Sequence, residues 1–174
     1  MNELDAVWSK MLLQAIEKAN AEGRSDVADY LRLKAANDAI RQASIGWIFD
    51  TLVEIAGDAN RSNSRISIER EDPYRFTYRG SNMAGSLLRL QQGVRCLTLE
   101  AGWTRTPSDG FMRGGALAVA RITHLGMSKA NVELFLQKRG ELPVWSTMKD
   151  EKPGNIVRTE TLREHFLIFT GDRL

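Results

Sequence analysis

The chain has 174 residues, of which 43% are hydrophobic and 26% are charged. These values are typical of soluble globular proteins and exclude collagen-like, wholly disordered and polytopic membrane proteins. The formal net charge is only +2, so the overall charge implies no particular partner.

The single cysteine, Cys96, excludes an internal disulfide and a cysteine-based metal site, and it indicates a reducing compartment. The first residues are acidic, unlike a secretory leader, and no apolar run reaches the length that spans a bilayer. We therefore expect a cytoplasmic protein that has no membrane partner.

The distributions of charge and of proline divide the chain into two parts near residue 58. Residues 1–58 carry six Lys/Arg and ten Asp/Glu (net −4), whereas residues 59–174 carry eighteen and twelve (net +6). All four prolines lie in the second part. We expect a single α+β domain over residues 1–174, with a helical part at 1–58, an antiparallel sheet at 64–149 and a C-terminal element at 156–170.

The apolar residues of the first part recur at intervals of three and four residues, which predicts an N-terminal helical hairpin packed on the sheet. The first helix ends at Gly23 and the second begins near Ser25. The second pattern runs for over thirty residues, which is long for a globular helix. It therefore predicts a break or bend at residues 44–46, and residues 45–55 could form a third helix.

After residue 64 the apolar period changes to two, which predicts about 6–8 antiparallel strands joined by short turns. One turn is expected at Asp72-Pro73. Residues 150–155 are typical of a linker or mobile loop. Residues 161–170 fit either a helix, because Thr161 and Glu164 have capping-box form, or a final strand.

The common nucleotide-binding, hydrolase and metalloprotease motifs are missing, so we favour a protein that is not an enzyme and expect no cofactor. His124 and His165 are the only histidines, and a metal site would need their chance proximity plus a carboxylate. We expect no metal. Cys96 is predicted to be a small buried apolar residue rather than a reactive thiolate.

The segment at 103–115 is longer than a hairpin loop usually needs. It combines arginines, hydroxyls and glycines that could hold a small anionic ligand. The candidate ligand-binding residues are Trp103, Arg105, Ser108, Asp109, Arg113, Gly114 and Gly115. The favoured alternative is structural, with Phe111 and Met112 folding back over the sheet as a plug.

Arginines are frequent in the expected sheet, where Arg75, Thr77 and Arg79 would form a row opposite Tyr74, Phe76 and Tyr78. Such a face could hold nucleic acid through phosphates. Because the aromatic residues and the arginines fall on opposite faces, we instead expect the arginines to be paired within the fold or across a dimer. Nucleic acid is not the expected partner.

Three functions remain, and no motif names a known family. The first is a non-enzymatic binding or interaction module that self-associates through the N-terminal helices, which carry apolar residues on more than one face. The second is an enzyme or sensor for a small anionic ligand with its pocket at 103–115. The third is a nucleic-acid-binding sheet. We favour the homodimeric interaction module.

Overall fold

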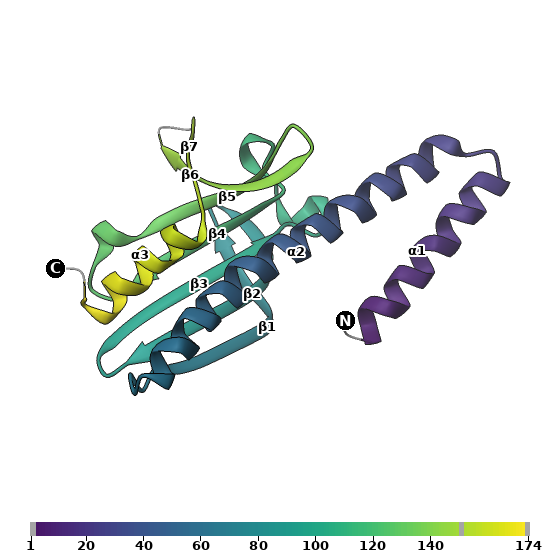
Figure 1. Ribbon diagram of the computed structural model, residues 1–174. Coiled ribbons are helices and arrows are strands. Elements are labelled where there is room, and N and C mark those ends of the chain that lie inside the picture. The colour runs from purple at the N-terminus through teal and green to yellow at the C-terminus, as the bar shows by residue number, and fades with distance from the viewer. Residues whose placement is uncertain (1–2, 150–151, 173–174) are drawn as a thin grey trace. The chain divides into compact units, whose positions relative to one another are not determined.

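A computed structural model describes residues 3–149 and 152–172 of the chain. The helices are α1 (Glu3–Ala21), α2 (Ser25–Arg61) and α3 (Thr159–Thr170). The strands are β1 (Ser67–Tyr78), β2 (Ser81–Gln92), β3 (Arg95–Trp103), β4 (Ala118–His124), β5 (Val132–Arg139), β6 (Leu142–Lys149) and β7 (Lys152–Ile156). They form one antiparallel sheet in the order β1 to β7 (Figure 1). The predicted α+β class is confirmed.

The chain divides into two compact units, residues 1–42 and 43–174, and the boundary falls inside α2. The first unit is a helical hairpin of α1 and the first part of α2, joined at Gly23, whose φ is +72°. Its small core contains Ile16, Ala19 and Ala28. The prediction of a single domain over the whole chain stays a prediction.

Helix α2 runs without interruption from Ser25 to Arg61, so the break predicted near residues 44–46 is wrong. Beyond Gly46 the buried positions continue at helical spacing through Ile48, Phe49 and Leu52, which have no exposed surface. Burial of this stripe outweighs the cost of about 1 kcal/mol that a glycine imposes inside a helix.

One face of the sheet, here called the helix face, is covered by α3 and by residues 43–61 of α2 (Figure 1). Two contacts place the helices there. The Trp145 indole on β6 donates a hydrogen bond to the Ser44 carbonyl of α2, and the His124 ring on β4 meets the His165 ring of α3. Seven large apolar strand residues on this face have no exposed surface: Leu88, Leu90, Leu97, Leu99, Ile122, Leu134 and Leu136.

The opposite face, here called the open face, carries a second apolar cluster that includes Tyr78, Met83, Val119 and Phe135, with Phe76 beside it. Tyr78 donates a 2.6 Å hydrogen bond to the Glu133 carboxylate. Burial, reinforced by this carboxylate, raises the pKa of the Tyr78 phenol, which stays protonated.

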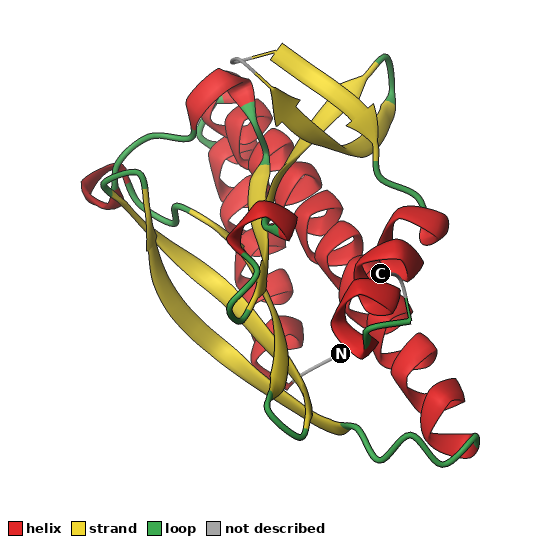
Figure 2. Ribbon diagram, turned by 90° about the vertical axis from the view of Figure 1, so that its left-hand side faces the viewer, coloured by secondary structure: helices red, strands yellow, loops and turns green. Residues whose placement is uncertain are grey.

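Strands β2 and β3 approach each other very closely at Gly85 and Gly102, which are paired in register. A Cβ atom at Gly85 would lie 1.8 Å from the Ala101 carbonyl oxygen. Only glycine fits such an approach. The sheet is strongly twisted rather than flat, as Figure 2 shows.

The turn predicted at Asp72-Pro73 is wrong. Strand β1 continues through these residues with a register shift between Glu71 and Tyr74. A proline is tolerated there because β1 is an edge strand and the shift interrupts its pairing. The hairpin turn lies instead at Arg79 and Gly80, whose φ angles of +47° and +86° suit a tight turn between twisted strands.

The C-terminal part of the described chain consists of a short strand followed by a helix. Of the linker or mobile loop predicted at 150–155, residues 152–155 belong to edge strand β7, which ends at Ile156. The Asn155 amide donates to the Thr147 hydroxyl of β6. Residues 150 and 151 lie outside the described part. Residues 159–170 form helix α3, which buries Leu162, Phe166 and Phe169. No helix in the described ranges is long and apolar enough to cross a membrane.

Candidate functional site

The loop at 103–115, where sequence reasoning placed a ligand site, contains two short 3₁₀ turns at Pro107–Asp109 and Arg113–Gly115. The Asp109 carboxylate accepts hydrogen bonds from the backbone amides of Arg105 and Thr106 at 3.2 and 2.9 Å and from the Thr106 hydroxyl at 3.0 Å. The bonds from Thr106 are the main cause that lowers the Asp109 pKa. Asp109 therefore organises its own loop, as the local pattern Thr-Pro-Ser-Asp could have indicated.

The two arginines of this loop have different neighbours. The Arg105 guanidinium lies 3.5 Å from the centroid of the Trp103 ring and donates to the Ala84 carbonyl. The positive charge of Arg113 acts on Tyr78, partly opposing the rise of its pKa. Binding of a small anionic ligand by these two arginines stays a prediction.

The rest of the loop packs onto the sheet. Met112 lies against the apolar cluster of the open face, and the Gly114 carbonyl accepts a hydrogen bond from the Gln137 side chain. The Ser108 hydroxyl meets that of Thr106 at 2.7 Å. Phe111, the other residue of the expected plug, is 82% exposed, so Met112 alone of the two covers the cluster.

A shallow depression of about 400 Å³ lies beside the second turn. Gly114 and Gly115 form one wall with positive φ angles of +63° and +66°. Lys138 and Arg139 of β5 form another. Of the seven predicted ligand-binding residues, these two glycines alone line it.

His124 and His165 lie side by side, although they belong to different elements. The His124 Nε2 and His165 Nδ1 atoms are 3.0 Å apart. Burial lowers the pKa of both imidazoles, and with the added effect of His124 it lowers that of His165 to about 4. No cluster of three metal-ligating side chains occurs among the residues described. The pair is therefore a neutral hydrogen-bonded contact between β4 and α3.

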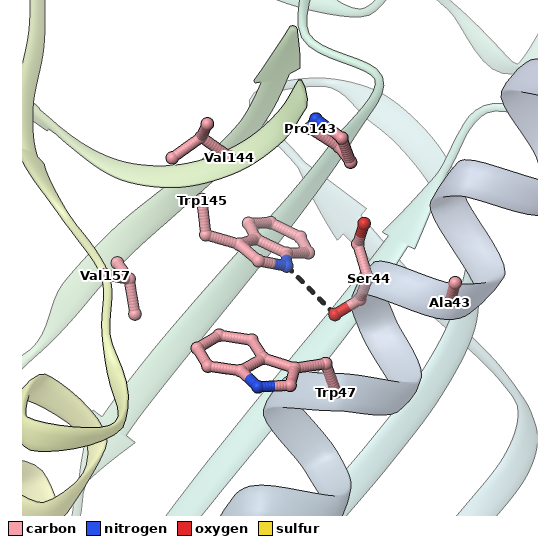
Figure 3. Close-up of a pocket in the computed structure, with 7 residues that line it drawn as sticks. All are labelled: Ala43, Ser44, Trp47, Pro143, Val144, Trp145 and Val157. Carbon is pink, nitrogen blue, oxygen red and sulfur yellow. Dashed lines mark hydrogen bonds between the residues drawn. The ribbon is translucent and has the colours of Figure 1, made fainter. Parts of the chain in front are cut away.

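Sequence reasoning missed a groove between α2 and β6 (Figure 3). It has a volume of about 330 Å³. Its lining consists of Ala43, Ser44 and Trp47 from α2, Pro143, Val144 and Trp145 from β6, and Val157, which precedes α3. The available signal was a tryptophan in each of two expected elements, but nothing in the sequence showed that those elements meet.

The two tryptophans of this groove have different environments. Trp145 is 3% exposed, and its Nε1–H donates to the Ser44 carbonyl oxygen at 3.0 Å. Trp47 is 39% exposed. In Figure 3 the two indoles lie one above the other, with Ser44 and Val157 on opposite sides. None of the lining side chains carries a charge, so the groove offers aromatic and aliphatic surface.

Four arginines of the sheet pair with carboxylates of the same unit. These ion pairs are Arg70–Asp50, Arg79–Glu133, Arg89–Glu69 and Arg121–Glu100. Two of them, Arg89–Glu69 and Arg121–Glu100, join neighbouring strands. Arg79, in the turn after β1, reaches Glu133 of β5, and Arg70 reaches Asp50 of α2.

Comparison of the chain with protein-family models, with curated proteins and with solved structures found no match.

Proposed function

We propose that the protein is a non-enzymatic interaction module that forms a homodimer through its N-terminal helical hairpin. One observation carries the proposal: the hairpin leaves six large apolar side chains more than half exposed. They are Val7, Trp8, Met11, Leu13, Tyr30 and Leu33. Large apolar side chains that stay exposed in such number are typical of an interaction site.

The exposed side chains lie on both helices of the hairpin. On α1, Met11 follows Val7 by four residues and Trp8 by three, so the three side chains form one stripe. On α2, Tyr30 and Leu33 follow the inward-facing Ala28 and Leu31 by two residues each. Two residues correspond to about 200° of helix rotation, so this pair points away from the core of the hairpin.

A second copy of the chain fits this surface better than a strongly charged partner. Residues 1–42 carry six Lys/Arg and seven Asp/Glu (net −1), so two copies repel each other little. Three of the basic residues are already paired with a carboxylate three or four residues away, in Lys18–Glu22, Arg32–Asp29 and Arg41–Asp38. Two hairpins can combine into a four-helix bundle, which covers apolar surface that one hairpin leaves bare.

The apolar surface that such a dimer covers can be set against the cost of association. Covering the exposed half of each large apolar side chain contributes about 1 kcal/mol. Two copies of six side chains then contribute on the order of 12 kcal/mol, against an association cost of about 4–15 kcal/mol. A dissociation constant in the micromolar range follows if the cost lies near the lower end.

A sensor for a small anionic ligand at the 103–115 loop is the second candidate function. The depression at Gly114 and Gly115, flanked by Lys138 and Arg139, favours it. A nucleic-acid partner is less favoured, because the sheet arginines in ion pairs have part of their charge neutralised.

Light scattering coupled to size exclusion tests the dimer. The parent chain should give about 39 kDa, twice its 19.5 kDa, at tens of micromolar. The double variant Tyr30→Glu/Leu33→Glu should raise the dissociation constant by about a hundredfold or more, because it replaces two apolar contacts by charges.

The matched control is Val94→Glu. Val94 lies in the turn between β2 and β3 and is 91% exposed, so this change also replaces an exposed apolar side chain by a charge, but outside the hairpin. The control should remain dimeric. A parent chain that stays monomeric up to several hundred micromolar, or a control that dissociates as readily as the double variant, would refute the proposal.

A further inference from the structure

We infer that the groove between α2 and β6 is a binding site for a small uncharged molecule that carries a ring system and one hydrogen-bonding group. The inference concerns the unit of residues 43–174 alone. It is independent of the dimer proposed for residues 1–42.

The size of the groove limits the occupant to a small molecule. Its volume of about 330 Å³ lies at the lower end of the range of roughly 300–1,000 Å³ that small-molecule sites occupy. A helix of a partner protein, about 10 Å across, requires a longer and wider surface than these seven residues provide.

The chemistry of the lining excludes a buried charge on the occupant. None of the lining side chains is ionisable, and burying an ion without a partner is strongly unfavourable. The exposed part of the Trp47 indole instead offers a flat aromatic surface and the Pro143 ring an apolar one, against which another ring packs well. Trp145 forms the floor, because it is almost wholly buried and its N–H is already bonded to Ser44.

One polar atom of the lining is available to orient such a molecule. The Ser44 carbonyl is used by Trp145, but within the described residues the Ser44 hydroxyl has no hydrogen-bond partner. In Figure 3 this hydroxyl points toward Pro143, at the rim of the groove. A hydroxyl can donate or accept, so a ligand with a single polar group can meet it while its ring covers Trp47.

The probe for the test is 1-naphthol, which has a flat ring system and one hydroxyl group. Isothermal titration calorimetry should give a dissociation constant below about 1 mM. Naphthalene-1-sulfonate, which has the same rings and a permanent charge, should bind at least about tenfold more weakly, because the lining offers that charge no partner.

Two variants locate the binding. Trp47→Ala should weaken 1-naphthol binding about tenfold or more, since it removes the aromatic wall. Ser44→Ala should weaken it about three- to tenfold, which corresponds to one lost neutral hydrogen bond. Both residues are only partly buried, so circular dichroism should show that both variants fold.

Phe111→Ala is the matched control, because Phe111 is an exposed aromatic residue that does not line the groove. The control should bind 1-naphthol like the parent. Failure of the parent to bind below 1 mM overturns the inference. So does equal weakening by Trp47→Ala and Phe111→Ala, which would show nonspecific adsorption to aromatic surface. Dimer formation is measured separately, so either proposal can fail without the other.

Discussion

The two parts of helix α2 carry similar side chains in different environments. Leu33, in the hairpin, is 57% exposed, whereas Leu52, in the sheet unit, has no exposed surface. The sheet offers a broad apolar face to which a helix can dock, but the hairpin offers one other helix, which covers only a narrow stripe. An apolar residue at helical spacing therefore does not show whether the monomer itself covers it.

Truncation of one apolar residue in each part of α2 should give the largest difference in the free energy of unfolding. Phe49→Ala should lower the free energy of unfolding by about 3–5 kcal/mol, because Phe49 is fully buried and its removal leaves a cavity. Leu33→Ala should cost less than about 0.5 kcal/mol when the protein is dilute enough to be monomeric. Urea denaturation at submicromolar concentration measures both. A cost for Leu33→Ala above 2 kcal/mol would show that the monomer already covers this side chain.

Acid should destabilise the sheet unit specifically, because both histidines lie there and the hairpin has none. An unfolded histidine takes up its proton near pH 6.5, whereas burial and the neighbouring His124 hold the pKa of folded His165 at about 4, despite the attraction of Glu164. The native state thus binds fewer protons between these values. Its stability is complete above pH 6.5 and falls as the pH drops toward 4.

The expected loss from His165 at pH 4.5 is about 2–3 kcal/mol. Urea denaturation of the parent and of His165→Gln at pH 7 and pH 4.5 isolates this contribution, because the other groups titrate in both proteins. The parent should lose more stability than the variant. Equal losses would mean that His165 is readily protonated in the folded state.

Removal of one ion pair from each unit should give the smallest difference in stability between the two units. The Glu100 carboxylate, whose side chain is 15% exposed, accepts hydrogen bonds from Arg121 and from the Tyr74 hydroxyl. Arg121→Gln should therefore cost about 1 kcal/mol. Arg32→Gln, which removes the exposed pair with Asp29 on α2, should change stability by about 0.3 kcal/mol or less. Thermal denaturation of the two variants compares these costs, and equal effects would show that burial of Glu100 is unimportant.

Local patterns were enough to predict most of the sheet. Alternation along Tyr74, Phe76 and Tyr78 marked a strand with two distinct faces, and the structure places these aromatic residues on the open face. The tight turn at Arg79-Gly80 was missed because an arginine with positive φ is uncommon, whereas Asp72-Pro73 has typical turn composition.

The candidate sites depend on contacts between distant residues, which local patterns do not encode. Trp47 and Trp145 line one groove, and His124 and His165 form one pair, because α2 and α3 dock on the same face of the sheet. The loop containing Asp109 had the composition of a ligand site. The Asp109 carboxylate, however, accepts hydrogen bonds from the loop's own backbone. Composition does not distinguish a carboxylate that binds a ligand from one that stabilises its own loop.

The order of the strands has a consequence for how the sheet unit folds. Every strand pairs only with its neighbours in sequence, so the sheet can grow hairpin by hairpin, and each step closes only a short loop. The hydrogen bond from Trp145 to Ser44 instead joins residues 101 positions apart. Docking of α2 onto β6 therefore carries the larger entropic cost. We expect it late in folding, after the strands that lie between α2 and β6 in the sequence have paired and so reduced the length of free chain that joins Ser44 to Trp145.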